Sequence, residues 1–464
     1  RFMAKLCVGW WLFLSDLSLC TGRASADVDE EGGKIWIQIV NTSGENPQLV
    51  LKHLPGCSSV ESPAAVSDCT CPVPSQVGNS QDSHQPLPKV IIAGVPKAGT
   101  SMLVSLMETC NPPARVPRVG QAAQVSGEAF YWVPELLPIG SDENLAWRGW
   151  RCGDSTSFAS SVHRVLSKEV CSLKAYQSAV FEALRREKFT VEKTPDYLVW
   201  PHVHAALRPL VGSGSKVVVL LRHPLLRLRS HFRHFSEWVK RIHSRQRQQE
   251  VADMMRAANP HAFVPAQAAF VGSSFGEYVK SVLEDPVFSR MHNEVERQLI
   301  GDYGAPGPPG SKRLNGVLDA YIRGIYSICD AHDWHVVCAF KRGPFTSYYL
   351  PQLISLIRMV GGCPSKWLRV LQTEQLFLQP SMVLRRLWEW LGVEGPVSFR
   401  RTRDPRATTV GGVGSGTHEI ERLHAVYANL HRMLATFLRD LGVLVTPFDV
   451  SLWRRPTVNL SASI

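Results

Sequence analysis

The residues with the clearest capacity for chemistry lie in the segment PKAGTS, residues 96–101. It follows a charge-free run at Val90–Gly94 and precedes an apolar run at Met102–Met107. These patterns predict a buried strand, a turn and a helix. A turn at a helix N-terminus offers backbone N–H groups to an anion, while Lys97 adds a positive charge and two hydroxyls add donors. We therefore expect a phosphate to bind at Lys97, Ala98, Gly99, Thr100 and Ser101.

A nucleoside triphosphate P-loop uses the same arrangement of strand, turn and helix. That motif requires G-x-x-x-x-G-K-[ST], with lysine after the second glycine. Here Lys97 precedes Gly99, and no other stretch supplies the full pattern. The spacing disfavours a nucleotide-dependent kinase, and an ordinary strand–turn–helix with a solvated lysine is the non-functional alternative.

A second group of cations follows another charge-free run, Lys216–Leu221. Arg222 ends this run, Pro224 opens a predicted helix, and Ser230 lies on that helix. An arginine can hold a phosphate through two donors, and a serine hydroxyl can add a third. Ligands of α/β proteins bind at the carboxyl ends of strands, so the pattern predicts a second anion site. A basic helix facing solvent is the alternative, and it suits Arg233, Lys240 and Arg245.

The two motifs in this order resemble those of sulfotransferases that use 3′-phosphoadenosine 5′-phosphosulfate (PAPS). PKAGTS corresponds to the segment that holds the 5′-phosphosulfate in these enzymes. R-x-P-x-x-R-x-x-S corresponds to the segment that holds the 3′-phosphate. The resemblance implies that Lys97 neutralises charge on the leaving oxygen and that no metal is required. It also implies the cofactor-binding residues Lys97, Ala98, Gly99, Thr100, Ser101, Arg222, Arg227 and Ser230.

Two further stretches resemble Golgi carbohydrate sulfotransferases of the glycosaminoglycan type. VEKTPDYL, residues 191–198, is similar to a segment of heparan sulfate sulfotransferases. SGEAFYW, residues 126–132, is similar to a stretch of chondroitin-type enzymes such as N-acetylgalactosamine 4-sulfate 6-O-sulfotransferase, although both neighbours of its glutamate differ. The resemblance implies Glu128 as the catalytic base, with Glu192 as the next candidate. Lys193 is expected either to contact the sulfonate or acceptor, or to form a surface ion pair with Glu192.

The implied reaction is in-line transfer of a sulfuryl group from PAPS to a hydroxyl of a glycosaminoglycan-like carbohydrate. A catalytically inactive protein that binds acidic glycans on the same fold is an alternative. The net charge of +11 agrees with a polyanionic partner in either case. No pattern typical of a nucleic-acid-binding domain occurs, so we expect no nucleic-acid partner.

The N-terminal run at residues 6–14 is apolar, and Ala24–Ala26 fits a cleavage pattern of small residues. We expect a signal peptide or an uncleaved signal anchor. Because the sequence begins with Arg1 rather than with Met, we expect it to be a fragment. Eleven cysteines and the glycosylation patterns at Asn41 and Asn459 agree with a disulfide-containing glycoprotein. These features predict a Golgi or secretory lumenal protein, either secreted or a type II membrane protein.

From residue 89 onward, strand patterns alternate with helix patterns. This predicts an α/β, P-loop-like three-layer sandwich with a central, mostly parallel sheet flanked by helices. Strands are expected at 35–40, 90–94, 216–221, 334–340 and 368–371. Helices are expected at 225–242, 275–283, 353–360, 382–391 and 420–441. The predicted organisation is a signal segment 1–26, a stem 27–86, a sulfotransferase domain 87–450 with a helical insertion at 241–315, and a tail 451–464.

Overall fold

The computed structural model describes residues 23–26, 35–42, 46–52, 87–108, 176, 187, 189–242, 274–300, 311–330, 342–393 and 418–453. The predicted base Glu128, the apolar run at 6–14, the expected strand at 334–340 and Asn459 lie outside these residues. Among the helices that are described, none combines the length and apolarity that a bilayer span requires.

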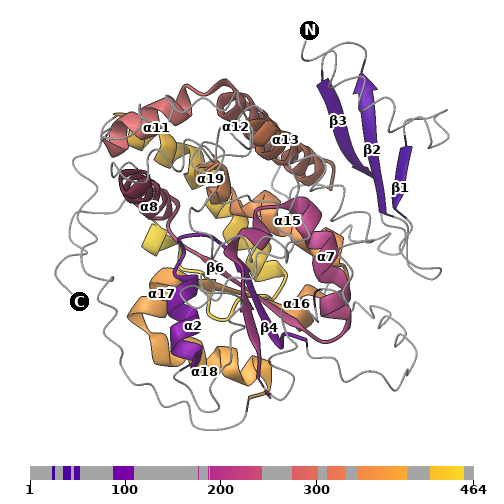
Figure 1. Cartoon of the computed structure of the whole chain (residues 1–464), viewed down its shortest axis with the longest axis vertical. Helices are drawn as coiled ribbons and strands as arrows, with labels where there is room; N and C mark the ends of the chain where they lie inside the picture. Colours follow the sequence, from indigo (N-terminus) through magenta and orange to yellow (C-terminus); the bar gives the residue numbers. More distant parts are fainter. Residues whose placement is uncertain are drawn as a thin grey trace.

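The centre of the fold is a four-stranded parallel sheet in the order β5-β4-β6-β7 (Figure 1). Its strands are β4 (Val90–Gly94), β5 (Val191–Lys193), β6 (Lys216–Leu221) and β7 (Leu368–Gln372). Every residue of β4 and β5 is buried, as expected for parallel strands covered on both faces. Beyond β7, Leu444 forms a further parallel bridge with Val370.

Helices cover both faces of the sheet, which gives three layers. The chain leaves β4 toward β5 through α2 (Thr100–Glu108) and returns past β4 to β6 through α7 (Pro201–Gly212). Because crossovers between parallel strands are right-handed, opposite directions of travel place α2 and α7 on opposite faces. Figure 1 shows α2 and α17 (Thr373–Leu378) on one side, with α7 and α15 (Tyr349–Val360) on the other. The α/β sandwich expected from the sequence is confirmed.

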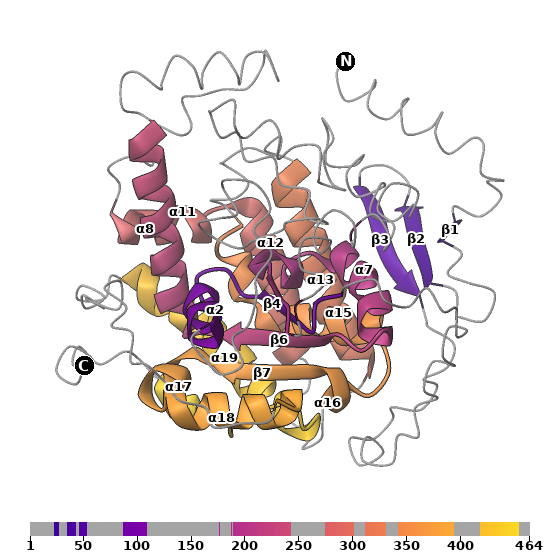
Figure 2. The same ribbon diagram turned by 60° about the horizontal axis from the view of Figure 1, so that its bottom comes forward.

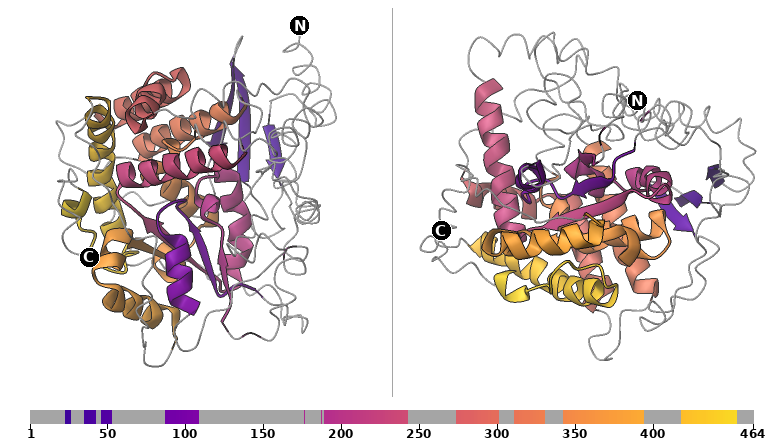
Figure 3. Two further views of the ribbon diagram at one scale, coloured as in Figure 1. Left: turned by 60° about the vertical axis from the view of Figure 1, so that its left-hand side comes forward. Right: turned by 90° about the horizontal axis from the view of Figure 1, so that it is seen from below.

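A group of helices stands beyond the carboxyl ends of the strands. The first, α8 (Pro224–Ile242), continues from the end of β6 and extends away from the sheet (Figures 2 and 3). It is joined by α11 (Phe275–Leu283), α12 (Pro286–Ile300), α13 (Ser311–Asp330) and α19 (His418–Asp440). Of the remaining described α-helices, α16 (Pro364–Trp367) directly precedes β7, and α18 (Pro380–Leu391) lies near the opposite end of the sheet (Figure 1).

The predicted elements agree closely with the observed ones for β6, α8, α11 and α19. The short strand β5 and the helix α7 were not expected from the sequence. Within and just before the predicted stem, β1 (Arg23–Ala26), β2 (Ile35–Thr42) and β3 (Asn46–Lys52) form an antiparallel sheet where one strand was expected.

Candidate functional site

The carboxyl ends of the four parallel strands bring the predicted anion-binding residues to one edge of the sheet. Lys97 follows β4, Lys193 ends β5, and Arg222 follows β6. Two hydrogen bonds show that these three residues lie close together. Arg222 Nη1 donates to the Lys97 carbonyl at 3.1 Å, and Lys193 Nζ donates to Ser101 Oγ at 3.0 Å. The two sequence motifs therefore meet at a single site.

The turn at residues 95–99 has an unusual backbone. Lys97 has φ +66° and Gly99 has φ +88°, both in the left-handed region. Glycine adopts this conformation readily, whereas for lysine it costs about 1–2 kcal/mol. Such strain persists where the surrounding structure imposes it and is often associated with function. Left-handed residues in a tight turn also gather backbone N–H groups into anion-binding concavities.

Side chains from helices α8 and α17 hold the carbonyl groups of this turn. Pro96 accepts from Arg227 Nη1 at 3.5 Å, and Ala98 accepts from Thr373 Oγ1 at 2.6 Å. Because a trans peptide points its N–H opposite to its C=O, the amides of Lys97 and Gly99 point away from these donors. The first N–H groups of α2 also lack intrahelical acceptors by helix geometry. The turn therefore directs donors away from the protein groups that support it.

Ala98 shapes the turn in a different way from its neighbours. Its side chain is buried, its N–H donates to the Val95 carbonyl at 3.1 Å, and its carbonyl is held by Thr373. Both backbone groups are thus already used within the protein. Thr100 is buried at the start of α2, whereas Ser101 is exposed.

Lys193 is almost completely buried, with 1% of its surface exposed, so the surface ion pair considered for it is wrong. Its contact with Ser101 places its ammonium group at the first turn of α2, where the helix dipole is also positive. An anion bound at this turn would be attracted by both.

Glu192 lies on the opposite face of β5 from Lys193, because successive strand residues alternate. It is fully buried and accepts from the hydroxyls of Tyr176, Tyr197 (2.5 Å) and Thr194 (3.2 Å). Burial raises its pKa to about 7, although the three hydroxyls oppose this. With its carboxylate enclosed by these partners, Glu192 is a structural group in this conformation and does not face an acceptor.

Arg227, which the sequence resemblance predicts as a phosphate ligand, is also fully buried. Its guanidinium donates to Ser347 Oγ at 2.9 Å and to the Gly343 carbonyl, in addition to Pro96. It therefore joins the 95–99 turn to the segment at 342–347. In this conformation Arg227 supports the turn through protein contacts.

Positive charge accumulates around Arg227. Nearby, Arg342 forms a buried ion pair with Asp196 at 3.0 Å. The pKa of His231 lies well below its usual range because of burial first, and then because of the charges of Arg227, Arg342 and Lys97. Burial and the neighbouring positive charges therefore keep the His231 imidazole neutral.

Arg222 is better placed than Arg227 to reach a ligand, since it is only partly buried. Its carbonyl accepts from Tyr349 Oη at 2.7 Å. Burial lowers the pKa of its guanidinium, and the nearby carboxylate of Glu374 opposes this change. Ser230 is partly buried on α8.

Three supporting residues were missed by the sequence analysis: Thr373, Glu374 and Arg342. Glu374 accepts from the His223 backbone N–H at 2.8 Å and from Trp453 Nε1 at 2.9 Å, which fixes the turn after β6. Thr373 and Glu374 lie two and three residues beyond the end of the predicted strand at 368–371, so the rule that ligands bind at the carboxyl ends of strands could have identified them. Arg342 had no comparable signal.

Comparisons with known proteins give little further information. No protein-family profile and no curated protein sequence matches the chain. Among solved structures, it is similar to a sulfotransferase from Alicyclobacillus acidocaldarius, with a TM-score of 0.40 and 16% identity, over 80% of this chain and 100% of that one. Within the described residues, no cluster of three or more His, Cys, Asp or Glu could hold a metal ion.

Proposed function

We propose that this protein is a PAPS-dependent sulfotransferase that acts on a hydroxyl of a carbohydrate, with a glycosaminoglycan-like polysaccharide as the acceptor. The observation that carries the proposal is the meeting of Lys97, Lys193 and Arg222 at the carboxyl edge of one parallel sheet. Two separate motifs that each suit an anion are thereby combined in a single site. A ligand with two separate phosphate groups matches this arrangement better than a single phosphate does.

The donor set divides into two parts that fit the two ends of PAPS. Around the 95–99 turn, the backbone amides, Lys97, Thr100 and Ser101 suit the 5′-phosphosulfate. At the start of α8, Arg222 and Ser230 suit the 3′-phosphate. Arg227 and Thr373 hold the turn in the conformation that presents its amides.

Transfer of a sulfuryl group requires in-line geometry and stabilisation of the charge that develops on the leaving phosphate. Lys97 provides a cation on the turn, and Lys193 provides a second cation at the first turn of α2. Lys193 is buried, and a charge there has a larger effect than in water. An acceptor hydroxyl also needs a base, and Glu128 remains our proposed residue for this step.

The compartment is a further part of the proposal. The apolar N-terminal run, the cysteine content and the glycosylation patterns support a Golgi or secretory lumenal protein, secreted or anchored as a type II membrane protein. Digestion with an endoglycosidase should reduce the apparent mass of the protein from native tissue. An unchanged mass together with recovery from the cytosol would contradict this compartment.

The test of the reaction is transfer of labelled sulfate from PAPS across a panel of glycosaminoglycans, neutral glycans and tyrosine peptides. We expect transfer to at least one glycosaminoglycan and none to the peptides. Binding of acidic glycans without transfer would support the inactive glycan-binding alternative. Phosphate transfer from ATP in place of sulfate transfer would support the kinase.

A further inference from the structure

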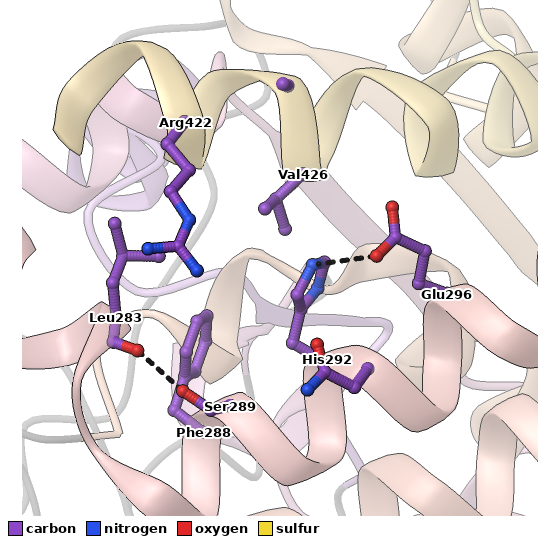
Figure 4. A pocket seen from close by; sticks show the side chains of 9 residues that line it. Leu283, Phe288, Ser289, His292, Glu296, Arg422 and Val426 are labelled. Carbon is purple, nitrogen blue, oxygen red and sulfur yellow. Dashed lines mark hydrogen bonds and ion pairs between the residues drawn. The ribbon is translucent and has the colours of Figure 1, made fainter. Parts of the chain in front are cut away.

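A separate pocket of about 310 Å³ lies between α12 and α19, beside the end of α11 (Figure 4). Leu283, Phe288 and Val426 supply apolar walls. None of its lining residues belongs to the anion site around Lys97. Its volume is at the lower end of the range for small-molecule pockets, so it suits one compact guest.

Arg422 supplies the positive end of this pocket. Figure 4 shows its guanidinium group directed from α19 toward Phe288 and His292. Arg422 is exposed on α19, and no ion pair joins it to another residue that the structure describes. An arginine fork in this setting matches the two oxygens of a carboxylate.

Glu296 supplies an acceptor at the other end. The ring of His292 lies between Glu296 and Tyr348, with Nε2 3.5 Å from the Glu296 carboxylate and Nδ1 2.9 Å from the Tyr348 hydroxyl. Burial lowers the pKa of His292, Arg422 lowers it further, and Glu296 opposes both. A neutral ring protonated at Nε2 can donate to Glu296 and accept from Tyr348. This leaves Glu296 able to accept hydrogen bonds from a guest.

The two ends restrict the chemistry of the guest. A simple aromatic or aliphatic carboxylate would satisfy Arg422 but would place apolar surface against the Glu296 carboxylate. A neutral sugar would satisfy Glu296 but not Arg422. A guest with a carboxylate at one end, hydroxyl donors at the other and an apolar face between them satisfies both ends and the walls.

We propose that this pocket binds a cyclic hydroxy-carboxylate of the size of one acidic monosaccharide. Its carboxylate pairs with Arg422, its hydroxyls donate to Glu296, and its apolar face packs against Phe288 and Val426. This binding site goes beyond the proposed transfer reaction and does not depend on it, because binding here requires neither PAPS nor turnover.

The test compares methyl β-D-glucuronoside with methyl β-D-glucoside, which carries a hydroxymethyl group in place of the carboxylate. Ligand-observed NMR titration of the full chain should show the glucuronoside binding about two- to fivefold more tightly, as expected for an ion pair with an exposed arginine. Arg422→Gln should remove this preference. Arg386→Gln removes an exposed arginine on α18 as a matched control and should leave it unchanged.

A second variant tests the need for the cavity while the charge of Arg422 is kept. Ala425 is exposed and lines the pocket, so Ala425→Phe should fill it without disturbing the core and should abolish binding of the glucuronoside. Equal affinity for the two glycosides, or glucuronoside binding unchanged in either Arg422→Gln or Ala425→Phe, would overturn the proposal. Tighter binding of citrate than of the glucuronoside would also overturn it, because an open-chain acid would then be the better guest.

Discussion

The buried polar groups near the carboxyl edge of the sheet fall into two regions with different arrangements. In the supporting region, Arg227, Arg342 and Glu192 form their hydrogen bonds and ion pairs with other protein groups. In the turn at 95–99, the carbonyl groups of residues 96–98 accept hydrogen bonds from side chains of other elements, and the first amides of α2 lack intrahelical acceptors. The first region resembles a structural network, and the second resembles a prepared anion site.

This difference separates stability from binding. A buried polar group that loses its partner costs free energy of folding, because it has no access to water. A group that serves an anion contributes little to folding and much to binding. Changes in the supporting region should therefore lower stability, whereas changes in the turn should lower affinity or rate.

The largest effect is expected for Arg227→Ala. It leaves the acceptors at Gly343 and Ser347 without their donor inside the protein, so we expect a loss of about 3–5 kcal/mol in the free energy of unfolding. Denaturation in urea measures this loss. Arg233→Ala, at an exposed position of the same helix, should change stability by less than about 0.5 kcal/mol. Similar stability of the two variants would contradict the supporting role of Arg227.

Lys97→Gly should have the opposite effects: it should keep the stability of the protein and lower the rate of sulfate transfer. Glycine suits the left-handed backbone at this position, so the variant should be at least as stable as the parent protein. Loss of the cation should lower the rate of sulfate transfer by about 10²–10³-fold. Rate measurements at saturating PAPS would show this, with the exposed Lys89→Ala as a control for charge. A near-normal rate for Lys97→Gly would remove Lys97 from the proposed machinery.

Glu192→Gln should change how stability depends on pH. The pKa of Glu192 in the folded state, about 7, lies above its usual value of 4.5, so the folded protein holds this proton more tightly than the unfolded chain. The protonated Glu192 carboxyl makes its full contribution to the free energy of unfolding below pH 4.5. As the pH rises toward 7, the free energy of unfolding falls by about 3 kcal/mol from this source. Glutamine cannot ionise, so melting temperatures of the variant should decline less over this interval. A parallel decline in both proteins would show that Glu192 does not titrate there.

Thr373→Val should have the smallest effect of the four. It removes the donor to the Ala98 carbonyl and should cost about 1–2 kcal/mol of stability. Because that bond also orients the turn, affinity for adenosine 3′,5′-bisphosphate should fall by a few fold. Thr373→Ser keeps the hydroxyl and should restore both. If valine is tolerated without loss of affinity, Thr373 does not orient the turn.

The turn at 95–99 was predictable from the sequence, whereas the supporting roles of Arg227 and Arg342 were not. Lys97 and Arg222 stand next to charge-free strand patterns, and the rule for parallel strands places both at the same edge. Arg227 shares its motif with Arg222, and nothing in the spacing separates a buried support from a ligand contact. Arg342 and Asp196 are 146 positions apart, so their pairing depends on tertiary packing that no local pattern records.

Short elements were also difficult to predict. The strand β5 has three residues, two of them charged, and therefore lacks the apolar run by which β4 and β6 were recognised. Its charges are tolerated because Lys193 contacts Ser101 and Glu192 is enclosed by tyrosines. Ser101 is 92 positions from Lys193, whereas the tyrosines around Glu192 are only 5 and 16 positions from it.

The most direct test of the central claim is the affinity for adenosine 3′,5′-bisphosphate, measured by titration calorimetry beside 5′-AMP and ATP. The account predicts that the protein binds the bisphosphate at least about tenfold more tightly than either, because Arg222 and the 95–99 turn each hold one phosphate. Arg222→Ala should remove this preference while leaving the affinity for 5′-AMP nearly unchanged. Equal affinity for ATP and the bisphosphate, or a preference that persists in Arg222→Ala, would contradict the account.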